Sequence, residues 1–306
     1  MTTKLESIKK IRFILTDFCN YRCKFCHNEG FQTKHSTFLA QEGIFLLTEA
    51  ARNLNIPKIT LTGGEPLLHK DIINIVKQIK KMYPKVSLGI STNGMLLSDK
   101  IFFDILPFID RLRLNCQSLN NDICQNICGP SADINKIIWI VDNAKRINSN
   151  INICLNFVLT VYNKDSLLDV IKFAIGKNID VKILEYKCID KDLYVNVEFI
   201  KQLIKTLSPI KEEKDYQDDD IYFFNNSTSR IRLCYSFCNN LKCGSCRECG
   251  EIRLTPALTL THCFEHSIEE INITDELSRG DLEAIEQRII QIDKIKGKAF
   301  KIHETK

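Results

Sequence analysis

The sequence predicts an α/β protein that consists of a partial (βα)6 barrel followed by a small, cysteine-rich C-terminal domain. Two observations support this fold class. Short apolar segments alternate with longer segments of helical periodicity, a pattern typical of parallel strands joined by helical crossovers. Many of the fourteen cysteines gather near the two ends of the chain, which sets the C-terminal part apart in composition. A doubly wound sheet is the alternative architecture for the same alternation.

The individual elements follow from apolar periodicity. The predicted strands cover 11–16, 58–62, 86–91, 111–116, 151–159 and 180–186. The predicted helices between them cover 40–54, 69–82, 97–105, 134–148 and 165–177. Because the active sites of such barrels lie at the C-terminal ends of the strands, residues that directly follow a strand are the first candidates for function.

A charged run over 211–220 contains no glycine, and we expect it to be a solvated connection between two domains. The barrel would then occupy residues 1–210 and the C-terminal domain residues 211–306. Behind the connection come β-like runs at 221–224 and 230–234, the cysteine-rich segment, and an amphipathic helix over roughly 280–294.

Composition limits the class of partner. The net charge is +4, from 42 basic and 38 acidic residues, and 44% of the residues are hydrophobic. This balance is that of an ordinary soluble globular protein, and it favours neither a nucleic acid nor a membrane as partner. The chain has no apolar stretch of about 18 residues, and its start does not resemble a signal peptide. We therefore expect a cytoplasmic protein.

In a reducing compartment, clustered cysteines are expected to be metal ligands rather than disulfides. Cys19, Cys23 and Cys26 follow the first predicted strand with the spacing C-x3-C-x2-C. Three thiolates can hold three irons of a cubane cluster and leave the fourth iron open, whereas electron-transfer clusters generally take four cysteines. A zinc knuckle or chance spacing is the alternative. The five cysteines scattered elsewhere are expected to be small buried hydrophobes, namely Cys116, Cys124, Cys128, Cys154 and Cys188.

Polar motifs end the next three predicted strands. Thr62-Gly63-Gly64-Glu65-Pro66 follows the second strand, and paired glycines let a backbone approach a ligand closely. Ser91-Thr92-Asn93-Gly94 ends the third strand and also suits a tight turn. On the fourth strand, period-two alternation places the side chains of Arg113, Asn115 and Gln117 on one face, where they are candidate ligand contacts.

Together, these motifs resemble the radical S-adenosylmethionine (SAM) superfamily. The resemblance implies that Cys19, Cys23 and Cys26 hold a [4Fe-4S] cluster whose open iron binds SAM. It also implies reductive cleavage of SAM to a 5′-deoxyadenosyl radical that abstracts hydrogen from a substrate. An electron donor such as flavodoxin or ferredoxin would be required. The further SAM contacts that it implies are Phe25, Gly63, Gly64, Glu65, Ser91 and Asn115.

A second cysteine motif lies near the C-terminus, with Cys246-x2-Cys249-x13-Cys263. With the front motifs, it resembles the GTP 3′,8-cyclases of molybdenum-cofactor biosynthesis and their relatives with a twitch domain. The resemblance implies a second [4Fe-4S] cluster on these three cysteines. Cys243 leaves two alternatives open, because it could be a fourth ligand of that cluster or complete a structural zinc site.

Three cations match substrate-binding positions of the cyclases, namely Arg12, Lys58 and Arg253. Several other positions differ. The differences are Glu251 and Thr60 where arginines are expected, Ser91 for a threonine, Gln117 for an aspartate, Cys154 near an expected lysine, and the absence of a Gly-Gly tail. Because charge-assisted contacts to phosphate are strong, losing these cations argues against GTP as the substrate.

The function predicted from the sequence is therefore a radical SAM enzyme that acts on a small, nucleotide-like substrate. The alternatives are a peptide-modifying enzyme that acts on a precursor peptide, GTP 3′,8-cyclase itself, and a non-enzymatic iron–sulfur or zinc module. The Gly-Gly-Glu-Pro motif argues against the last alternative, because an electron carrier needs no SAM site.

Overall fold

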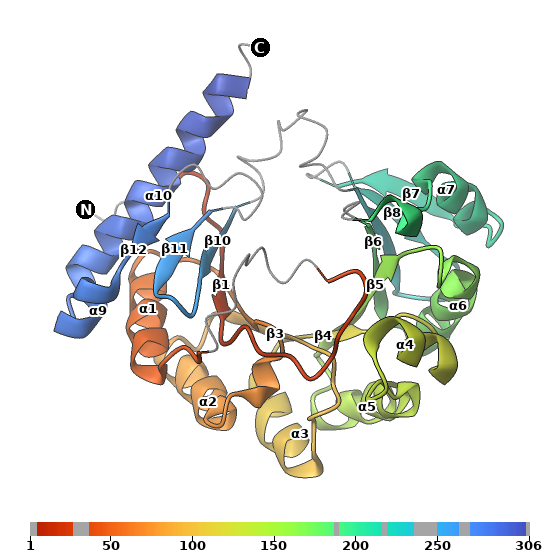
Figure 1. Cartoon of the computed structure of the whole chain (residues 1–306), viewed down its shortest axis with the longest axis horizontal. Coiled ribbons are helices and arrows are strands. Elements are labelled where there is room, and N and C mark those ends of the chain that lie inside the picture. Colours follow the sequence, from red (N-terminus) through yellow and green to blue (C-terminus); the bar gives the residue numbers. More distant parts are fainter. Residues whose placement is uncertain are drawn as a thin grey trace.

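The computed structural model describes residues 5–26, 37–186, 190–215, 219–235, 250–262 and 270–303. Six parallel strands alternate with helices along the first part of the chain (Figure 1). The strands are β1 (Lys10–Ile14), β2 (Lys58–Thr62), β3 (Ser87–Thr92), β4 (Arg111–Asn115), β5 (Asn152–Leu159) and β6 (Asp180–Glu185). The helices are α1 (Gln41–Asn53), α2 (Ile72–Met82), α3 (Asp99–Ile105), α4 (Asn121–Cys128), α5 (Ile134–Ile147) and α6 (Leu167–Lys177).

The order of these strands identifies the architecture. Each strand from β1 to β6 lies beside the next one along the chain, and every one of these pairs is parallel. The helices cover the outer, convex side of the curved sheet (Figure 1). A doubly wound sheet would reverse its strand order and carry helices on both faces. The predicted partial barrel is therefore confirmed.

The C-terminal part of the chain extends both edges of the same sheet. β9 lies parallel to β6 at one edge, and β10 lies parallel to β1 at the other. The remaining elements are α7 (Val197–Lys205), β7 (Lys211–Lys214), β8 (Asp220–Phe223), β9 (Arg230–Cys234), β10 (Glu251–Leu254), β11 (Thr259–Thr261), β12 (Ile271–Asn272), α9 (Thr274–Arg279) and α10 (Leu282–His303). The division into two domains at residue 210 stays a prediction.

One predicted connection has regular structure instead. The charged run expected to be a solvated connection begins with strand β7, which pairs antiparallel with β8. Lys211 pairs with Phe223 and Lys214 with Asp220 in this ladder. An exposed edge strand tolerates charged side chains, because they discourage pairing with a further strand.

Alternation along the strands gives the sheet an apolar outer face and a polar inner face. Ile11 and Phe13 of β1 are fully buried, whereas the side chain of Arg12 between them is partly exposed. The same alternation holds in β4 and β5. Successive side chains of a strand point to opposite faces, so the buried set packs under the helices and the polar set lines the concave face.

Local sequence signals fix several helix ends. Side chains of Ser98, Asn120 and Asp133 accept hydrogen bonds from amides in the first turns of α3, α4 and α5. α6 ends at Asn178, whose left-handed backbone suits asparagine. None of the described helices is long and apolar enough to cross a membrane.

Candidate active site at the barrel mouth

The cysteine loop follows β1 and rests on the end of α4. The amide of Arg22 donates to the carbonyl of Cys128 over 3.0 Å, and the amide of Lys24 donates to that of Ile127 over 2.9 Å. The last carbonyls of a helix lack donors within the helix, so they are available to hold a neighbouring loop. In the loop, Cys19 and Cys26 are exposed and Cys23 is partly buried.

Two asparagines from neighbouring strands approach the cysteine sulfurs. Nδ2 of Asn93, just past β3, lies 3.9 Å from Sγ of Cys19 and donates to Oδ1 of Asn20 over 2.7 Å. Nδ2 of Asn115, at the end of β4, lies 3.9 Å from Sγ of Cys23. In iron–sulfur sites, hydrogen bonds from nearby amides to the cysteine sulfurs orient the ligands and adjust the potential of the cluster.

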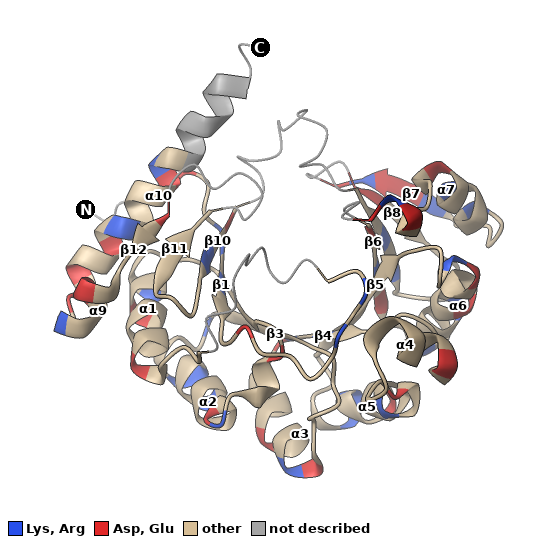
Figure 2. Cartoon of the chain, in the orientation of Figure 1, with Lys and Arg blue, Asp and Glu red and all other residues tan. Residues whose placement is uncertain are grey.

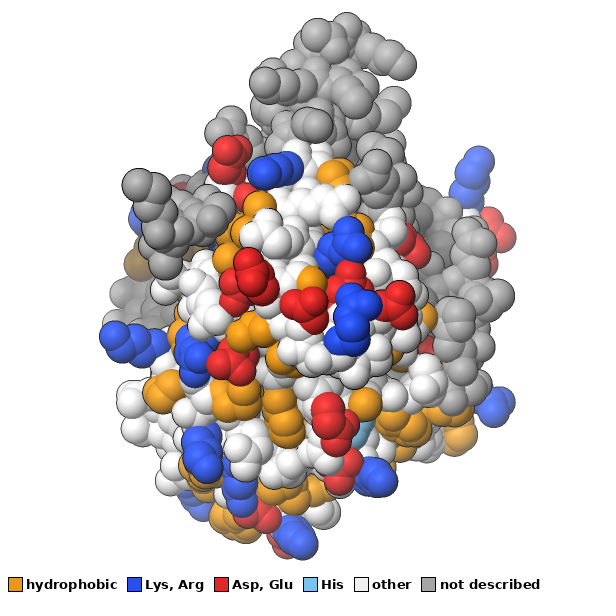
Figure 3. Space-filling view, turned by 90° about the vertical axis from the view of Figure 1, so that its left-hand side faces the viewer, with side chains coloured by type: hydrophobic (Ala, Val, Ile, Leu, Met, Phe, Trp, Pro, Cys, Tyr) orange, Lys and Arg blue, Asp and Glu red, His pale blue; other side chains and the backbone are white. Residues whose placement is uncertain are grey.

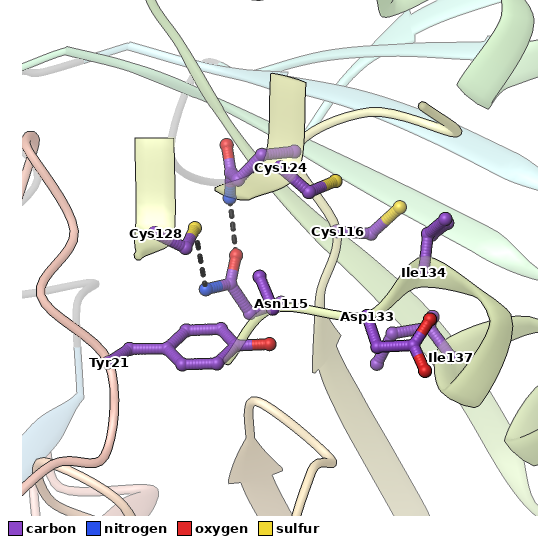
Figure 4. A pocket seen from close by; sticks show the side chains of 10 residues that line it. Tyr21, Asn115, Cys116, Cys124, Cys128, Asp133, Ile134 and Ile137 are labelled. Carbon is purple, nitrogen blue, oxygen red and sulfur yellow. Dashed lines mark hydrogen bonds between the residues drawn. The ribbon is translucent and has the colours of Figure 1, made fainter. Parts of the chain in front are cut away.

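Gln117 sets the orientation of Asn115. Its Nε2 donates to Oδ1 of Asn115, so the Nδ2 group of Asn115 is turned toward Sγ of Cys23 and of Cys128, the second of which Figure 4 shows. Gln117 is itself buried and fixed, because its Oε1 accepts from the amide of Val158 over 3.0 Å and from Asn163 over 3.1 Å. Gln117, expected on the same open face as Asn115, therefore acts as a support for Asn115.

A further thiol, Cys128, lies beside the cysteine loop. Nδ2 of Asn115 is 3.9 Å from Sγ of Cys128, and Tyr21 lines the same small pocket (Figure 4). A hydrogen bond with Cys128, together with burial, raises the pKa of Cys23 well above its ordinary value. The sequence assigned Cys128 only to the buried core. The sequence predicts no helix over 121–128, and nothing in it indicates that Cys128, at the end of α4, lies beside the cysteine loop.

Close contacts with the backbone of a neighbouring segment require glycine at positions 63 and 64. A Cβ atom on Gly63 would lie 2.4 Å from the carbonyl oxygen of Thr16, and one on Gly64 would lie 2.0 Å from that of Phe18. The amides of Gly64 and Glu65 donate to these two carbonyls over 2.7 Å each. The motif therefore clamps the segment that leads into the cysteine loop, and its predicted contact with SAM stays a prediction.

Glu65 ties the ends of β2 and β3 together. Its carboxylate is fully buried and accepts from the hydroxyl of Thr92 over 2.6 Å and from the amide of Asn93 over 2.8 Å. Burial raises the pKa of Glu65 to about 7, although these hydrogen bonds act in the opposite direction. Glu65 thereby positions Asn93 next to Cys19.

Where strands β1 and β10 pair, a carboxylate neutralises two of the predicted substrate cations, Arg12 and Arg253. Glu251 forms ion pairs with Lys10 and Arg253, and its Oε1 lies 3.8 Å from the guanidinium of Arg12. Burial alone would raise the pKa of Glu251, but Arg12, Arg253 and Lys10 hold it well below its ordinary value. Arg12 also donates to the hydroxyl of Thr62 over 3.1 Å. The structure thus brings Arg12 and Arg253 together, with an acidic partner between them.

The other predicted residues are more dispersed. Lys58 is exposed at the start of β2, far along the strand from the cysteine loop. Ser91 lies on the inner face of β3, opposite Arg113 of β4. Phe25 is partly buried against the core. The predicted ligands of the second cluster, Cys246, Cys249 and Cys263, lie outside the described residues, as does Cys243.

Cys19, Cys23 and Cys26 offer three thiols from one loop, and such a donor set suits an iron–sulfur cluster. Within the part of the chain that the structure describes, no three Cys, His, Asp or Glu side chains lie close enough to hold one metal ion. In a cubane each cysteine binds a different iron, so its thiolates stand further apart than the ligands of one zinc ion. In this loop two thiols are exposed, and the amides of Asn93 and Asn115 lie near the sulfurs of Cys19 and Cys23.

Comparison with known proteins decides the family. Residues 13–174 match the family model described as the Radical SAM superfamily. The chain belongs to the radical SAM superfamily. Within that superfamily it resembles a probable GTP 3′,8-cyclase of Sulfurisphaera tokodaii, with 30% identity over 93% of this chain and 89% of the relative. It is 26% identical to a GTP 3′,8-cyclase of Clostridium perfringens over 90% of this chain and 86% of that one.

Two solved structures share the fold. Streptococcus suis SuiB, bound to the precursor peptide SuiA, superposes with a TM-score of 0.67 and 13% identity over 91% of this chain. The chain spans 64% of the length of SuiB. The protein anSMEcpe, with bound AdoMet, gives a TM-score of 0.60 and 14% identity over 89% of this chain and 81% of that one. At these identities the similarity concerns the fold.

Proposed function

We propose that this radical SAM enzyme binds a [4Fe-4S] cluster through Cys19, Cys23 and Cys26 and acts on a small, nucleotide-like substrate inside the barrel. When bound, such a cluster supplies the electron that cleaves SAM to methionine and a 5′-deoxyadenosyl radical. The observation that carries the proposal is the position of the cysteine loop, which Asn93 and Asn115 hold at the C-terminal ends of the strands. That end of the barrel is where this fold places its chemistry.

The chain's own residues have separate tasks in this proposal. Asn93 and Asn115 direct amide hydrogens toward the cysteine sulfurs, and Glu65 and Gln117 keep the two amides in place. Gly63 and Gly64 allow the loop to pass close to β2 and would offer backbone groups to SAM. Ser91 and Phe25 are proposed as further SAM contacts, and a flavodoxin or ferredoxin as electron donor.

The decisive experiment measures SAM cleavage. Anaerobically reconstituted, dithionite-reduced chain is expected to form 5′-deoxyadenosine and methionine from SAM, and Cys23→Ala is expected to abolish this reaction. Cys154→Ala is the matched control, because Cys154 lies away from the loop on the inner face of β5. Cleavage by the Cys23→Ala variant at the rate of the unaltered chain would rule out the assignment.

We further propose an auxiliary cluster on Cys246, Cys249 and Cys263, with Cys243 as a bystander. The support is the C-x2-C-x13-C spacing, together with similarity to the cyclases that extends over most of the chain. The reconstituted chain is then expected to contain about eight irons, from two four-iron clusters. Cys243→Ala should leave the iron content and the paramagnetic signal unchanged. Loss of that signal would make Cys243 the fourth ligand, and zinc in place of iron would contradict the proposal.

A further inference from the structure

A buried thiol, Cys128, lies beside the cysteine loop without belonging to its motif. Cys128 is the last residue of α4. Its carbonyl accepts a hydrogen bond from the amide of Arg22 over 3.0 Å. The carbonyl of the preceding residue, Ile127, accepts from the amide of Lys24 over 2.9 Å. Cys23 stands between these two anchored loop residues, so its place beside the end of α4 is fixed.

The sulfurs of Cys23 and Cys128 share one amide group. Nδ2 of Asn115 lies 3.9 Å from Sγ of Cys23 and 3.9 Å from Sγ of Cys128, and Figure 4 shows the second contact. A hydrogen bond between the two cysteine side chains raises the pKa of Cys23, which agrees with this proximity. The two sulfurs and the Asn115 amide therefore form one compact group.

Iron binding determines which of the two thiols donates. A cysteine binds iron as a thiolate, so a bound Cys23 has no proton and only accepts hydrogen bonds. Cys128 is outside the proposed ligand set and keeps its S–H group. Asn115, which Gln117 orients, directs its amide toward the Cys128 sulfur. A chain of hydrogen bonds then runs from Gln117 through Asn115 and Cys128 to Cys23, and in such a chain each bond polarises the next.

Charges on the outside of the molecule have less effect on this group. The outer helices carry basic and acidic residues together (Figure 2), and the face in Figure 3 also intersperses the two signs. Opposite charges offset each other at a distance, and dissolved ions screen exposed charges beyond about 10 Å. A donor in direct contact with a ligand sulfur therefore has the stronger influence on that sulfur.

We infer that the thiol of Cys128 donates a hydrogen bond to the sulfur of Cys23 when that sulfur binds iron, and thereby raises the reduction potential of the SAM-binding cluster. The inference rests on the proposed function, because it takes Cys23 as a ligand. One-electron reduction adds negative charge to the cluster and its thiolates, and a hydrogen-bond donor at a thiolate stabilises that charge. Cys128 is a positioning residue that acts on the cluster through Cys23.

A redox titration of the reconstituted full chain, followed by electron paramagnetic resonance, tests the inference. The signal to follow is the one that the Cys23→Ala chain lacks, because this excludes the proposed auxiliary cluster. At a given potential, Cys128→Ala is expected to lower the ratio of reduced to oxidised cluster roughly tenfold, which is about 59 mV for one electron. Cys128→Ser keeps a hydroxyl donor and is expected to keep a potential near that of the unaltered chain.

Cys124→Ala is the matched control on the same helix. Cys124 is also buried, four residues before Cys128, and its Sγ donates to the carbonyl of Ser118 over 3.2 Å. Its replacement should leave the potential unchanged. Iron analysis and thermal unfolding show whether each variant is loaded and folded.

An unchanged potential in Cys128→Ala would overturn the inference, as would an equal shift in Cys124→Ala or a Cys128→Ser potential as low as that of Cys128→Ala. Loss of iron from Cys128→Ala would also overturn it, because Cys128 would then be a ligand. If the unaltered chain cleaves SAM and the potential is the same in Cys128→Ala, the inference alone is contradicted. If the unaltered chain takes up no cluster on Cys23, the proposed function is contradicted, and the inference falls with it.

Discussion

At the scale of single residues, Glu251 determines the net charge where strands β1 and β10 pair. The cyclases are expected to carry an arginine at this position, and this chain carries a buried carboxylate among three cations. Such a carboxylate neutralises the cations, as the phosphate of a bound ligand otherwise would. Glu251 and its three cations therefore form an internal ion network, and these cations are less available to a triphosphate.

Glu251→Gln is expected to lower the free energy of unfolding by about 3 kcal/mol, because it leaves buried cations without their counter-charge. Glu276→Gln is the control, since that buried carboxylate pairs with the more exposed Arg288. The Glu276→Gln variant should lose about 1 kcal/mol or less of its free energy of unfolding. Chemical denaturation at neutral pH measures both. Equal losses in the two variants would contradict the network.

The same carboxylate predicts a pH dependence. The pKa of Glu251 is lowered in the folded state, so the folded state releases this proton more readily than the unfolded chain. Its stabilising contribution is therefore complete above the ordinary glutamate pKa and is lost as the pH falls below it. Glu251→Gln should remove this part of the acid sensitivity, which denaturation at a series of acidic pH values would detect.

At the scale of elements, the turn after β2 couples three strands. Gly63 and Gly64 lie against the backbone that leads from β1 to the cysteines. Glu65 is hydrogen-bonded to Thr92 and Asn93 at the end of β3. The geometry of the cysteine loop thus depends on a turn that contains none of its cysteines. The sequence predicts these glycines as ligand contacts, which stays a prediction, but nothing local shows which distant backbone lies against them.

Gly64→Ala is expected to destabilise the fold by about 2 kcal/mol or more, since its Cβ would lie 2.0 Å from the backbone oxygen of Phe18. Gly176→Ala is the matched control within α6, where no atom lies within 4 Å of the added Cβ. That variant should gain about 0.5 kcal/mol from helix propensity. Thermal unfolding compares the two, and a Gly64→Ala chain as stable as the original would refute the close contact.

Sequence reasoning succeeded where information was local and failed where it was not. β2 was predicted residue for residue, because an apolar run between turn signals is sufficient for a buried strand. β7 was missed because Lys-Glu-Glu-Lys has no apolar pattern, and β10 because four residues beside β1 acquire their burial from that partner. The network of Gln117, Asn115 and Cys128 likewise depends on contacts between separate elements.

At the scale of the whole molecule, the chain resembles GTP 3′,8-cyclases over most of its length and carries Glu251 among its predicted substrate cations. We expect that the reconstituted chain does not convert GTP to the 3′,8-cyclised product, and that its gene does not rescue a strain lacking the cyclase. The Clostridium perfringens cyclase, 26% identical, serves as the positive control in both assays. Rescue comparable to that control would show that Glu251 does not prevent triphosphate binding.

The pairing of β1 with β10 also determines when the sheet can form during protein synthesis. β1 leaves the ribosome well before β10, which begins at Glu251. α10 follows later still, and its Asp293 accepts hydrogen bonds from the amides of Ser7 and Ile8. Contacts so distant in sequence form slowly. Until β10 has been synthesised, the edge of β1 lacks this partner strand, and Lys10 and Arg12 lack the carboxylate of Glu251. Premature termination before β10 would therefore release a chain prone to edge-to-edge aggregation.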